Sequence, residues 1–234
     1  MLNFTIFGIP VRVQPFFWIL PLFVSGAFRM EPGQGMLQML IIWTVVIFLS
    51  ILVHELGHAL TGLKTGGGSA AIELNGFGGL AYNYGGRFSL KGRRWMIAMG
   101  PGAGFILLAL TILAMTIAYG AADGLNLASA LAVGITFAPL NTEVINNAGL
   151  FIFFSAMIFV NFWWGILNLL PIMPLDGGQL FETFSKSPKL TFKVGMVTGG
   201  LVALYGLNTG SVFLMFLMGY LAYNNYRAYQ QSKY

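Results

Sequence analysis

The chain of 234 residues contains no cysteine and very little charge. The absence of cysteine excludes disulfide bonds and thiolate ligands, so any bound metal must be held by His, Asp or Glu. Charged residues make up only 8% of the chain, whereas 57% of the residues are hydrophobic. Soluble globular domains carry about 25% charged residues. We therefore expect most of this chain to lie in lipid.

The chain also lacks the features of a nucleic-acid-binding protein and of a removable signal peptide. The formal net charge is only +5, and the basic residues are not gathered in a soluble domain. The amino-terminal stretch has no charged n-region, short apolar region and small-residue cleavage site in succession. We therefore expect no nucleic-acid partner, and we expect the first apolar run to be retained in the membrane.

Six apolar runs are present that approach or exceed the roughly 20 helical residues needed to cross a bilayer. They cover about residues 13–28, 36–63, 94–120, 149–170, 190–207 and 210–227. The first run is short, and the last two are separated only by the turn "LNTG", which predicts a tight helical hairpin. The predicted fold is an all-α polytopic membrane protein with about six transmembrane helices, in a single domain over residues 1–234.

The basic residues orient this topology. Every Lys and Arg except Arg29 falls on one side of the six predicted spans. Cytoplasmic loops carry the excess of positive charge, so both termini are expected in the cytoplasm. The protein is expected in the plasma membrane, which would be the inner membrane of a prokaryote. The basic clusters are also expected to contact anionic lipid.

The glycine-rich loop 66–87 contains a hairpin signal. Asn75-Gly76 is a turn dipeptide between the strand-favouring stretches "AAIEL" and "GLAYNY". A β-hairpin on the cytoplasmic side, associated with the membrane, is therefore expected. The alternative is a flexible glycine-rich connector, but the aromatic side chains of the second stretch argue against it.

The stretch "ILVHELGHAL", residues 51–60, places ionisable groups inside the second apolar run. His54 and His58 are four residues apart, so on a helix both imidazoles can reach one ion. In the H-E-x-x-H pattern the glutamate, here Glu55, lies beside the metal and acts as a base without ligating it. These two histidines are the only ones in the chain. The alternative is a pair of buried histidines bonded to neighbouring helices, although ionisable residues inside a membrane span usually have a function.

Two histidines leave a zinc site incomplete, and the chain has only seven acidic residues from which to supply a third ligand. Elimination leaves Asp176, in "NLLPIMPLDGGQ" at the cytoplasmic end of the fourth run, which is also the end where the histidines lie. The other acidic residues besides Glu55 are Glu31, Asp123 and Glu143, on the opposite side of the membrane, and Glu73 and Glu182, in the hairpin and in a loop.

The chain before Asp176 must leave the helix while it is still at membrane depth. Pro171 and Pro174 each remove a backbone donor and disfavour helix in the preceding residue, so the span is expected to unwind there. Gly177 and Gly178 permit the turn that points Asp176 inward. The alternative is that "PLDGG" forms an ordinary surface turn.

The motifs "HELGH" and "NLLPIMPLDGG" together resemble the site-2 protease family of intramembrane zinc metalloproteases. This resemblance covers about residues 36–178, which would be the catalytic core, with a carboxy-terminal helical hairpin at about 190–227. It implies that His54, His58 and Asp176 bind one Zn²⁺ per chain and that Glu55 is the general base. It also implies that Asn168 holds the scissile carbonyl or its oxyanion.

The resemblance further implies a substrate and the surface that receives it. The substrate would be a transmembrane protein, cut within or near its membrane span. The family has a membrane-associated hairpin that is thought to align an extended substrate, and the corresponding residues here are Asn75, Gly76, Phe77, Gly78 and Gly79.

The sequence also departs from the family pattern. An asparagine that often follows the Gly-Pro pair of the next span is missing after Gly100-Pro101. No PDZ-like insertion or carboxy-terminal nucleotide-binding domain is expected, so the chain resembles a minimal family member. Two other classes of function remain as alternatives: a metal-ion transporter that uses the same His and Asp residues, and a membrane interaction protein without catalysis.

Overall fold

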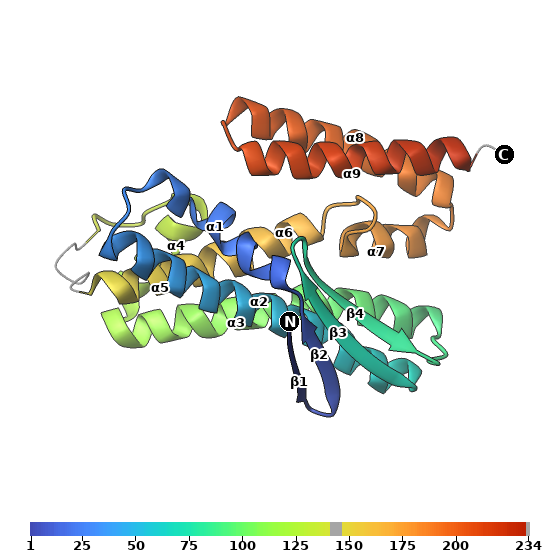
Figure 1. The fold of residues 1–234 in the computed structure, drawn as a ribbon, viewed down its shortest axis with the longest axis horizontal. Coiled ribbons are helices and arrows are strands. Elements are labelled where there is room, and N and C mark those ends of the chain that lie inside the picture. Colours follow the sequence, from blue (N-terminus) through green and yellow to red (C-terminus); the bar gives the residue numbers. More distant parts are fainter. Residues whose placement is uncertain (141–146, 233–234) are drawn as a thin grey trace.

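The computed structural model describes residues 1–140 and 147–232. Long helices and one small sheet make up the molecule (Figure 1). Glu143 and Lys233, which the charge argument used, lie outside the described residues, so their side of the membrane stays a prediction.

Four of the helices in the described part of the chain are long and apolar enough to cross a membrane. These are α2 (Gln34–Gly66), α3 (Leu90–Tyr119), the helix Ala148–Asn168, and α8 (Pro188–Asn208). The third of them consists of α5 (Ala148–Phe159), a π-helical turn (Val160–Trp164) and α6 (Gly165–Asn168). α9 (Val212–Gln231) has 20 residues and a more polar carboxy-terminal half. The predicted total of six spans stays a prediction.

Residues 13–28, expected as the first span, form several short helices rather than one long helix. They comprise a 3-10 helix (Pro15–Ile19), α1 (Leu20–Ser25) and the start of a second 3-10 helix (Ala27–Arg29). Two prolines lie at the starts of the first two helices, and Gly26 ends α1 in the left-handed conformation at φ 69°. These residues interrupt the helix because proline lacks an N–H and the left-handed residue reverses the chain.

The predicted hairpin exists, but it is half of a larger sheet. Strands β3 (Ser69–Asn75) and β4 (Gly78–Tyr84) are antiparallel, and β2 (Ile9–Val13) pairs in parallel with β3. β1 (Leu2–Ile6) completes the order β1-β2-β3-β4. β2 alternates buried and exposed residues, as expected for a strand with one face on a core. The sequence analysis missed this amino-terminal strand pair.

The turn of the β3–β4 hairpin lies one residue later than predicted. Asn75 pairs with Gly78, so the two turn residues are Gly76 and Phe77. The side-chain oxygen of Asn75 accepts a hydrogen bond of 2.9 Å from the backbone N–H of Phe77. Asn75 thus stabilises the turn through its side chain and does not occupy a central position.

The connection between α3 and α5 contains a further helix, α4 (Ala121–Val133), that the sequence analysis did not identify. Its residue Asn126 is buried at 5% exposure and holds the chain that follows α4. The amide of Asn126 donates to the carbonyl of Ala138 at 2.9 Å and accepts from the N–H of Phe137 at 2.6 Å.

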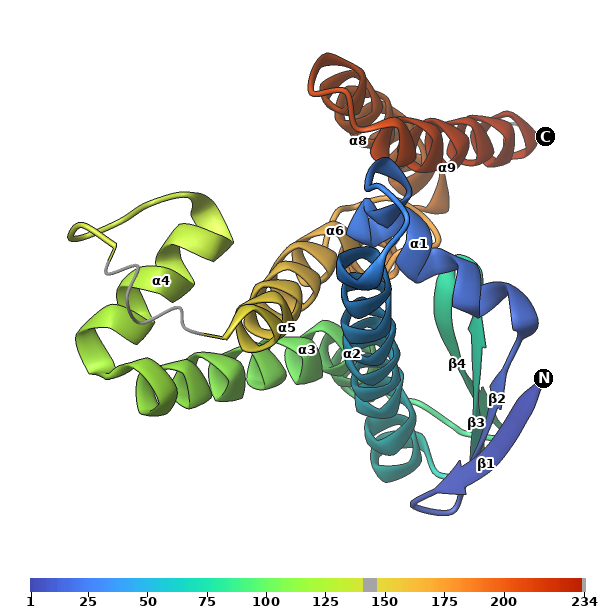
Figure 2. The ribbon, with the colours of Figure 1, turned by 60° about the vertical axis from the view of Figure 1, so that its left-hand side comes forward.

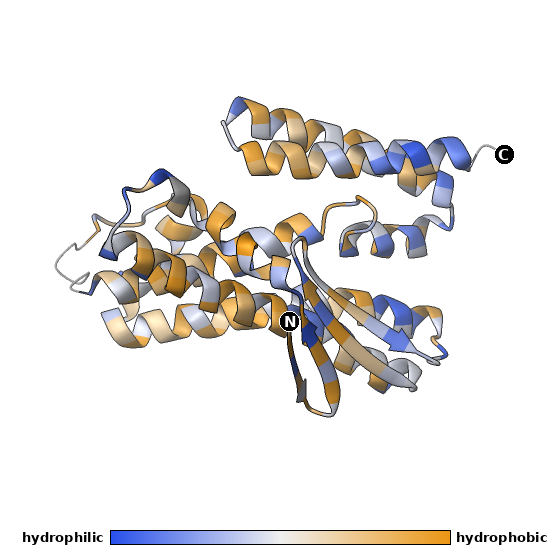
Figure 3. Cartoon of the chain, viewed as in Figure 1, coloured by the Kyte–Doolittle hydropathy of each residue, from blue (hydrophilic) through white to orange (hydrophobic). Residues whose placement is uncertain are grey.

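The carboxy-terminal hairpin of α8 and α9 is confirmed, with the turn at Thr209–Ser211. The two helices lie side by side in both views (Figures 1 and 2). α7 (Asp176–Ser185) contacts both α3 and α8 and so connects this hairpin to the rest of the molecule. Hydrophilic residues gather at one end of the structure, over α7, the start of α3 and the carboxy-terminal end of α9 (Figure 3).

Candidate metal centre

His54, His58 and Asp176 meet in the structure. The Nε2 atom of His54 lies 3.0 Å from Oδ2 of Asp176, and Nε2 of His58 lies 3.2 Å from the same oxygen. The two Nε2 atoms are 3.2 Å apart, and the three ligand atoms lie within 4.8 Å of one another. The exposed fractions of the three residues are 5%, 9% and 8%. Three ionisable side chains therefore converge at one buried point.

An interruption between α6 and α7 brings Asp176 to this point. α6 ends at Asn168, and α7 begins at Asp176 after a non-helical segment that contains a cis bond before Pro174. A Cβ on Gly177 would overlap the carbonyl of Leu169, and one on Gly178 would lie about 2.5 Å from the carbonyl carbon of Ile172. The two glycines are therefore needed because α7 starts directly against the unwound segment.

The ring of His58 is oriented by the neighbouring helix. Its Nδ1 lies 2.8 Å from the backbone oxygen of Met96 on α3. A carbonyl only accepts, so Nδ1 carries the proton and Nε2 is free to bind a metal. Gly100, one turn further along α3, leaves room for the ring, because a Cβ there would overlap Nε2 of His58.

Glu55 lies beside the cluster and is 5% exposed. Ala81 on β4 lines the same cavity as Glu55. Gly79 lies against the same side chain, since a Cβ on Gly79 would overlap the Cγ of Glu55. The carboxylate is thus held between the histidine-bearing helix and strand β4.

The three candidate ligands, Glu55 and Asn168 line one cavity of about 480 Å³. Asn168 donates through Nδ2 to the carbonyl of Trp164 at 3.1 Å, so its amide is bonded to its own helix in this structure. Of the predicted substrate-binding residues, Asn75, Phe77 and Gly79 line the cavity. The other two do not: Gly76 faces Phe16, and Gly78 faces Trp164.

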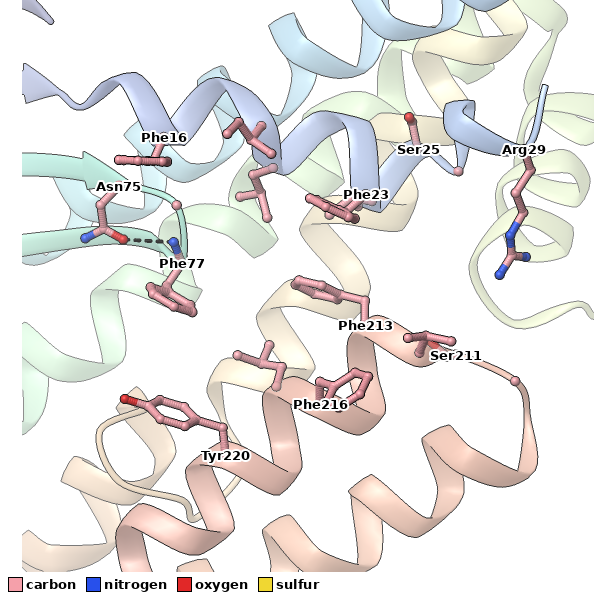
Figure 4. Close-up of a pocket in the computed structure, with 18 of the residues that line it drawn as sticks. Phe16, Phe23, Ser25, Arg29, Asn75, Phe77, Ser211, Phe213, Phe216 and Tyr220 are labelled. Atoms are coloured by element: carbon pink, nitrogen blue, oxygen red, sulfur yellow. Dashed lines mark hydrogen bonds between the residues drawn. The ribbon is translucent and has the colours of Figure 1, made fainter. Parts of the chain in front are cut away.

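A second, apolar cavity of about 1260 Å³ lies between α1 and α9 (Figure 4). Phe77 and Tyr220 line both cavities. Their rings are stacked with centroids 6.5 Å apart and planes at 14°. The apolar cavity and the cavity at the histidines therefore adjoin at this aromatic pair.

The donor set fits a zinc ion. Catalytic zinc sites use three protein ligands from histidine nitrogen and carboxylate oxygen, with one position left for water or substrate. Two imidazoles and one carboxylate are present here, and the second nitrogen of His58 has the outer partner that zinc-bound histidines usually have.

Two residues of this site gave no usable signal in the sequence. Met96 acts through its backbone oxygen, so its residue type carries no information about the contact. Asn225 of α9 is buried and bonded to the backbone of Met173, three residues before Asp176. It lies in the polar run "NNYR" in the carboxy-terminal half of α9, where the residue types alone do not indicate a buried contact.

Known proteins resemble this chain in sequence and in fold. Residues 42–207 match the family described as peptidase family M50. A zinc metalloprotease of Methanocaldococcus jannaschii is 24% identical over 222 residues, which cover 91% of this chain and 55% of that protein. The chain thus spans about half the length of this curated relative. The solved structure of the site-2 protease from Methanocaldococcus jannaschii has the same fold, with a TM-score of 0.61, 21% identity, and coverage of 97% of this chain and 94% of that one.

Proposed function

Because the chain belongs to peptidase family M50, we propose that it is a zinc metalloendopeptidase that cuts a membrane protein within or near a transmembrane segment. One observation carries the proposal: His54, His58 and Asp176 converge next to Glu55 inside a molecule of long apolar helices. The alternatives of a metal transporter and of a non-catalytic interaction protein are not favoured by this family.

The residues of the cavity divide the chemistry among them. His54, His58 and Asp176 would hold the zinc, which polarises the scissile carbonyl and makes a water molecule more acidic. Glu55 takes the proton of the attacking water and returns it to the leaving amine. Its position between α2 and β4 suits this role, because the carboxylate lies in the cavity with the ligands but is not one of the three converging groups.

Strand β4 offers an edge for an extended substrate. In the described residues its sheet partner is β3, on one side only. Glu55 packs against Gly79 of this strand, so β4 lies beside the base. A substrate segment that adds to this edge would place its backbone beside Glu55. Asn168 then donates to the oxyanion after its amide leaves the carbonyl of Trp164, and the residues from Asn75 to Gly79 contact the substrate.

The apolar cavity between α1 and α9 gives the substrate a route from the lipid. It is lined by apolar side chains that include Phe16, Phe23, Phe213 and Phe216, and it adjoins the catalytic cavity at Phe77 and Tyr220. A transmembrane segment can enter along this surface and unwind at the aromatic pair. The carboxy-terminal hairpin would form one wall of the route.

The protein is an integral membrane protein, and we place its metal centre near the cytoplasmic face of the cell membrane. The hydrophilic end of the structure includes α7 and the start of α3 (Figure 3). Seven of the twelve Lys and Arg residues lie close to these elements in the sequence: Arg87, Lys91, Arg93 and Arg94 before and within the start of α3, and Lys186, Lys189 and Lys193 after α7. We further propose that the chain has six spans and that both termini lie in the cytoplasm. It would form one domain, with a catalytic core of residues 36–178.

The proposal is tested with purified protein in detergent. We expect about one zinc per chain, measured by elemental analysis, and cleavage of model single-span membrane proteins. Glu55→Gln should keep the zinc and lose cleavage by about 10²–10⁴-fold, the usual contribution of a general base. Glu73→Gln is the matched control, because Glu73 is bonded to Gln14 on the sheet, away from the ligands. Wild-type cleavage by Glu55→Gln would refute the assignment of the base.

A further inference from the structure

Asn225 of α9 holds both backbone groups of Met173. Its Nδ2 donates to the carbonyl of Met173 at 2.6 Å, and its Oδ1 accepts from the N–H of Met173 at 3.3 Å. Nδ2 also donates to the carbonyl of Leu221 within α9 at 2.8 Å. Because the residue is 1% exposed, water does not replace these bonds. The amide therefore connects α9 to the unwound segment between α6 and α7.

Only two residues separate Met173 from Asp176, and both are held. The N–H of Leu175 donates to the carbonyl of Ile172 at 2.8 Å, and the side chain of Gln179 donates to the carbonyl of Pro174 at 2.9 Å. Hydrogen bonds thus restrain each backbone position between Ile172 and Asp176. A displacement of Met173 would be passed on to the carboxylate of Asp176.

Packing attaches the same segment to both helices of the carboxy-terminal hairpin. Ile172 is fully buried in a cluster with Met218 and Leu221 of α9. On α8, a Cβ on Gly195 would lie 3.3 Å from the Cα of Ile172 and would overlap the side-chain amide of Asn225. The close approach of α8 at Gly195 therefore confines the amide to the position in which it binds Met173.

We propose that Asn225 is a positioning residue of the metal centre, which sets the place of Asp176 through the backbone of Met173. The inference rests on the proposed metal centre. It makes the α8–α9 hairpin part of the metal-binding unit, although none of the three ligands lies on it. α9 also lines the apolar cavity with Phe213, Phe216 and Tyr220, so one helix contacts both the substrate route and the ligand-bearing segment.

The test measures the metal centre directly and without catalysis. The metal-free protein is titrated with Zn²⁺ against a chromophoric chelator, and the visible spectrum of the Co²⁺-loaded protein reports the ligand geometry. We expect Asn225→Ala to weaken Zn²⁺ binding by about 10–100-fold, as loss of outer-shell partners does, and to change the Co²⁺ spectrum. Asn126→Ala is the matched control, because it also removes a buried amide that holds a loop by its N–H and C=O groups, but at α4. It should keep both the affinity and the spectrum.

A second pair of variants leaves Asn225 itself unmutated and changes only the space around its amide. Gly195→Ala inserts a methyl group against the amide, whereas Gly200→Ala on the same helix meets no atom within 4 Å. We expect the spectral change and the weaker binding in Gly195→Ala only. This pair decides the question if Asn225→Ala does not fold.

The outcomes separate this inference from the proposed function. A wild-type protein that binds neither Zn²⁺ nor Co²⁺ would overturn the metal centre itself. If wild type binds both ions, and folded Asn225→Ala or Gly195→Ala binds them with wild-type affinity and spectrum, the positioning role is wrong. If Asn126→Ala or Gly200→Ala changes the spectrum equally, the effect is a general one of packing and the inference also fails.

Discussion

The Nε2 atom of His54 and the Oδ2 atom of Asp176 lie 3.0 Å apart, although 122 positions separate the two residues in the chain. The histidine comes from the middle of an apolar helix, and the aspartate is the first residue of α7 after a helix break. Bringing such groups together away from water is costly unless they are paired or bind an ion. His54, His58 and Asp176 meet this condition by pairing with one another, in an arrangement that could hold a metal ion.

Removal of the carboxylate tests the third ligand. Loss of a residue that only supports a ligand typically weakens metal binding by about 10–100-fold. Asp176→Ala should weaken Zn²⁺ binding by more than this, because it removes a direct ligand. The control is Asp123→Ala on α4, which follows the carboxy-terminal end of α3. It removes an acidic residue outside the cluster and should leave Zn²⁺ binding unchanged. Chelator competition measures both constants. Unchanged affinity in Asp176→Ala would show that the ligand set is different.

A methyl group on α3 tests the packing against His58. Gly100→Ala places a Cβ where it overlaps the imidazole, whereas the Cβ of Gly102→Ala would be 3.4 Å from the sulfur of Met99, an ordinary contact. We expect Gly100→Ala to destabilise the fold by about 1–3 kcal/mol, the usual cost of overpacking, and to weaken metal binding. Thermal unfolding in detergent and Zn²⁺ titration measure the two effects. Equal behaviour of the two variants would contradict the close approach of α3.

Two neighbouring arginines at the start of α3 should differ in their contribution to stability. Arg94 donates to the hydroxyl of Thr183 at 3.0 Å and to its carbonyl at 2.8 Å, near the end of α7. Hydrogen bonds to charged groups contribute about 1.5–3 kcal/mol, so Arg94→Ala should lower stability by about that amount.

Arg93 provides the control for Arg94. It forms an ion pair with Glu182 at 3.2 Å, and its side chain is 48% exposed. Exposed pairs contribute about 0–1 kcal/mol, so Arg93→Ala should unfold close to the wild-type temperature. The thermal midpoints of unfolding of the two variants measure the difference. A larger decrease for Arg93→Ala than for Arg94→Ala would contradict our assignment of Arg94 as the residue that holds α7.

The grouping of the three candidate metal ligands could be predicted from the sequence, because histidine and acidic residues are scarce in this chain. Two histidines and seven acidic residues leave few combinations, and the period of the helix brings His54 and His58 to one face. Pro171 and Pro174 marked the helix break, since the effect of proline on the backbone is local. The meeting of these groups was therefore predictable, whereas their roles in catalysis stay predictions.

The remaining features depend on distant contacts. The strands β1 and β2 join a larger sheet because β3 lies beside β2, and a short apolar run cannot be distinguished from a buried helix segment by periodicity alone. The amide of Asn225 finds Met173 from 52 residues away, and no local pattern indicates such a pair. The turn at Gly76-Phe77 was misplaced by one residue, because the Asn-Gly dipeptide is typical of the central positions of a turn.

The parallel pairing of β2 with β3 also bears on how the protein is made. Val11 lies opposite Ile72, so the chain between these strands includes α1 and the whole of α2 with its "HELGH" motif. On the ribosome, the first strand pair emerges long before the strand that joins it. Such long-range pairing must wait for the intervening chain. The sheet is therefore completed only after the histidine-bearing helix has been synthesised, and β2 waits for its partner β3 while that helix is made.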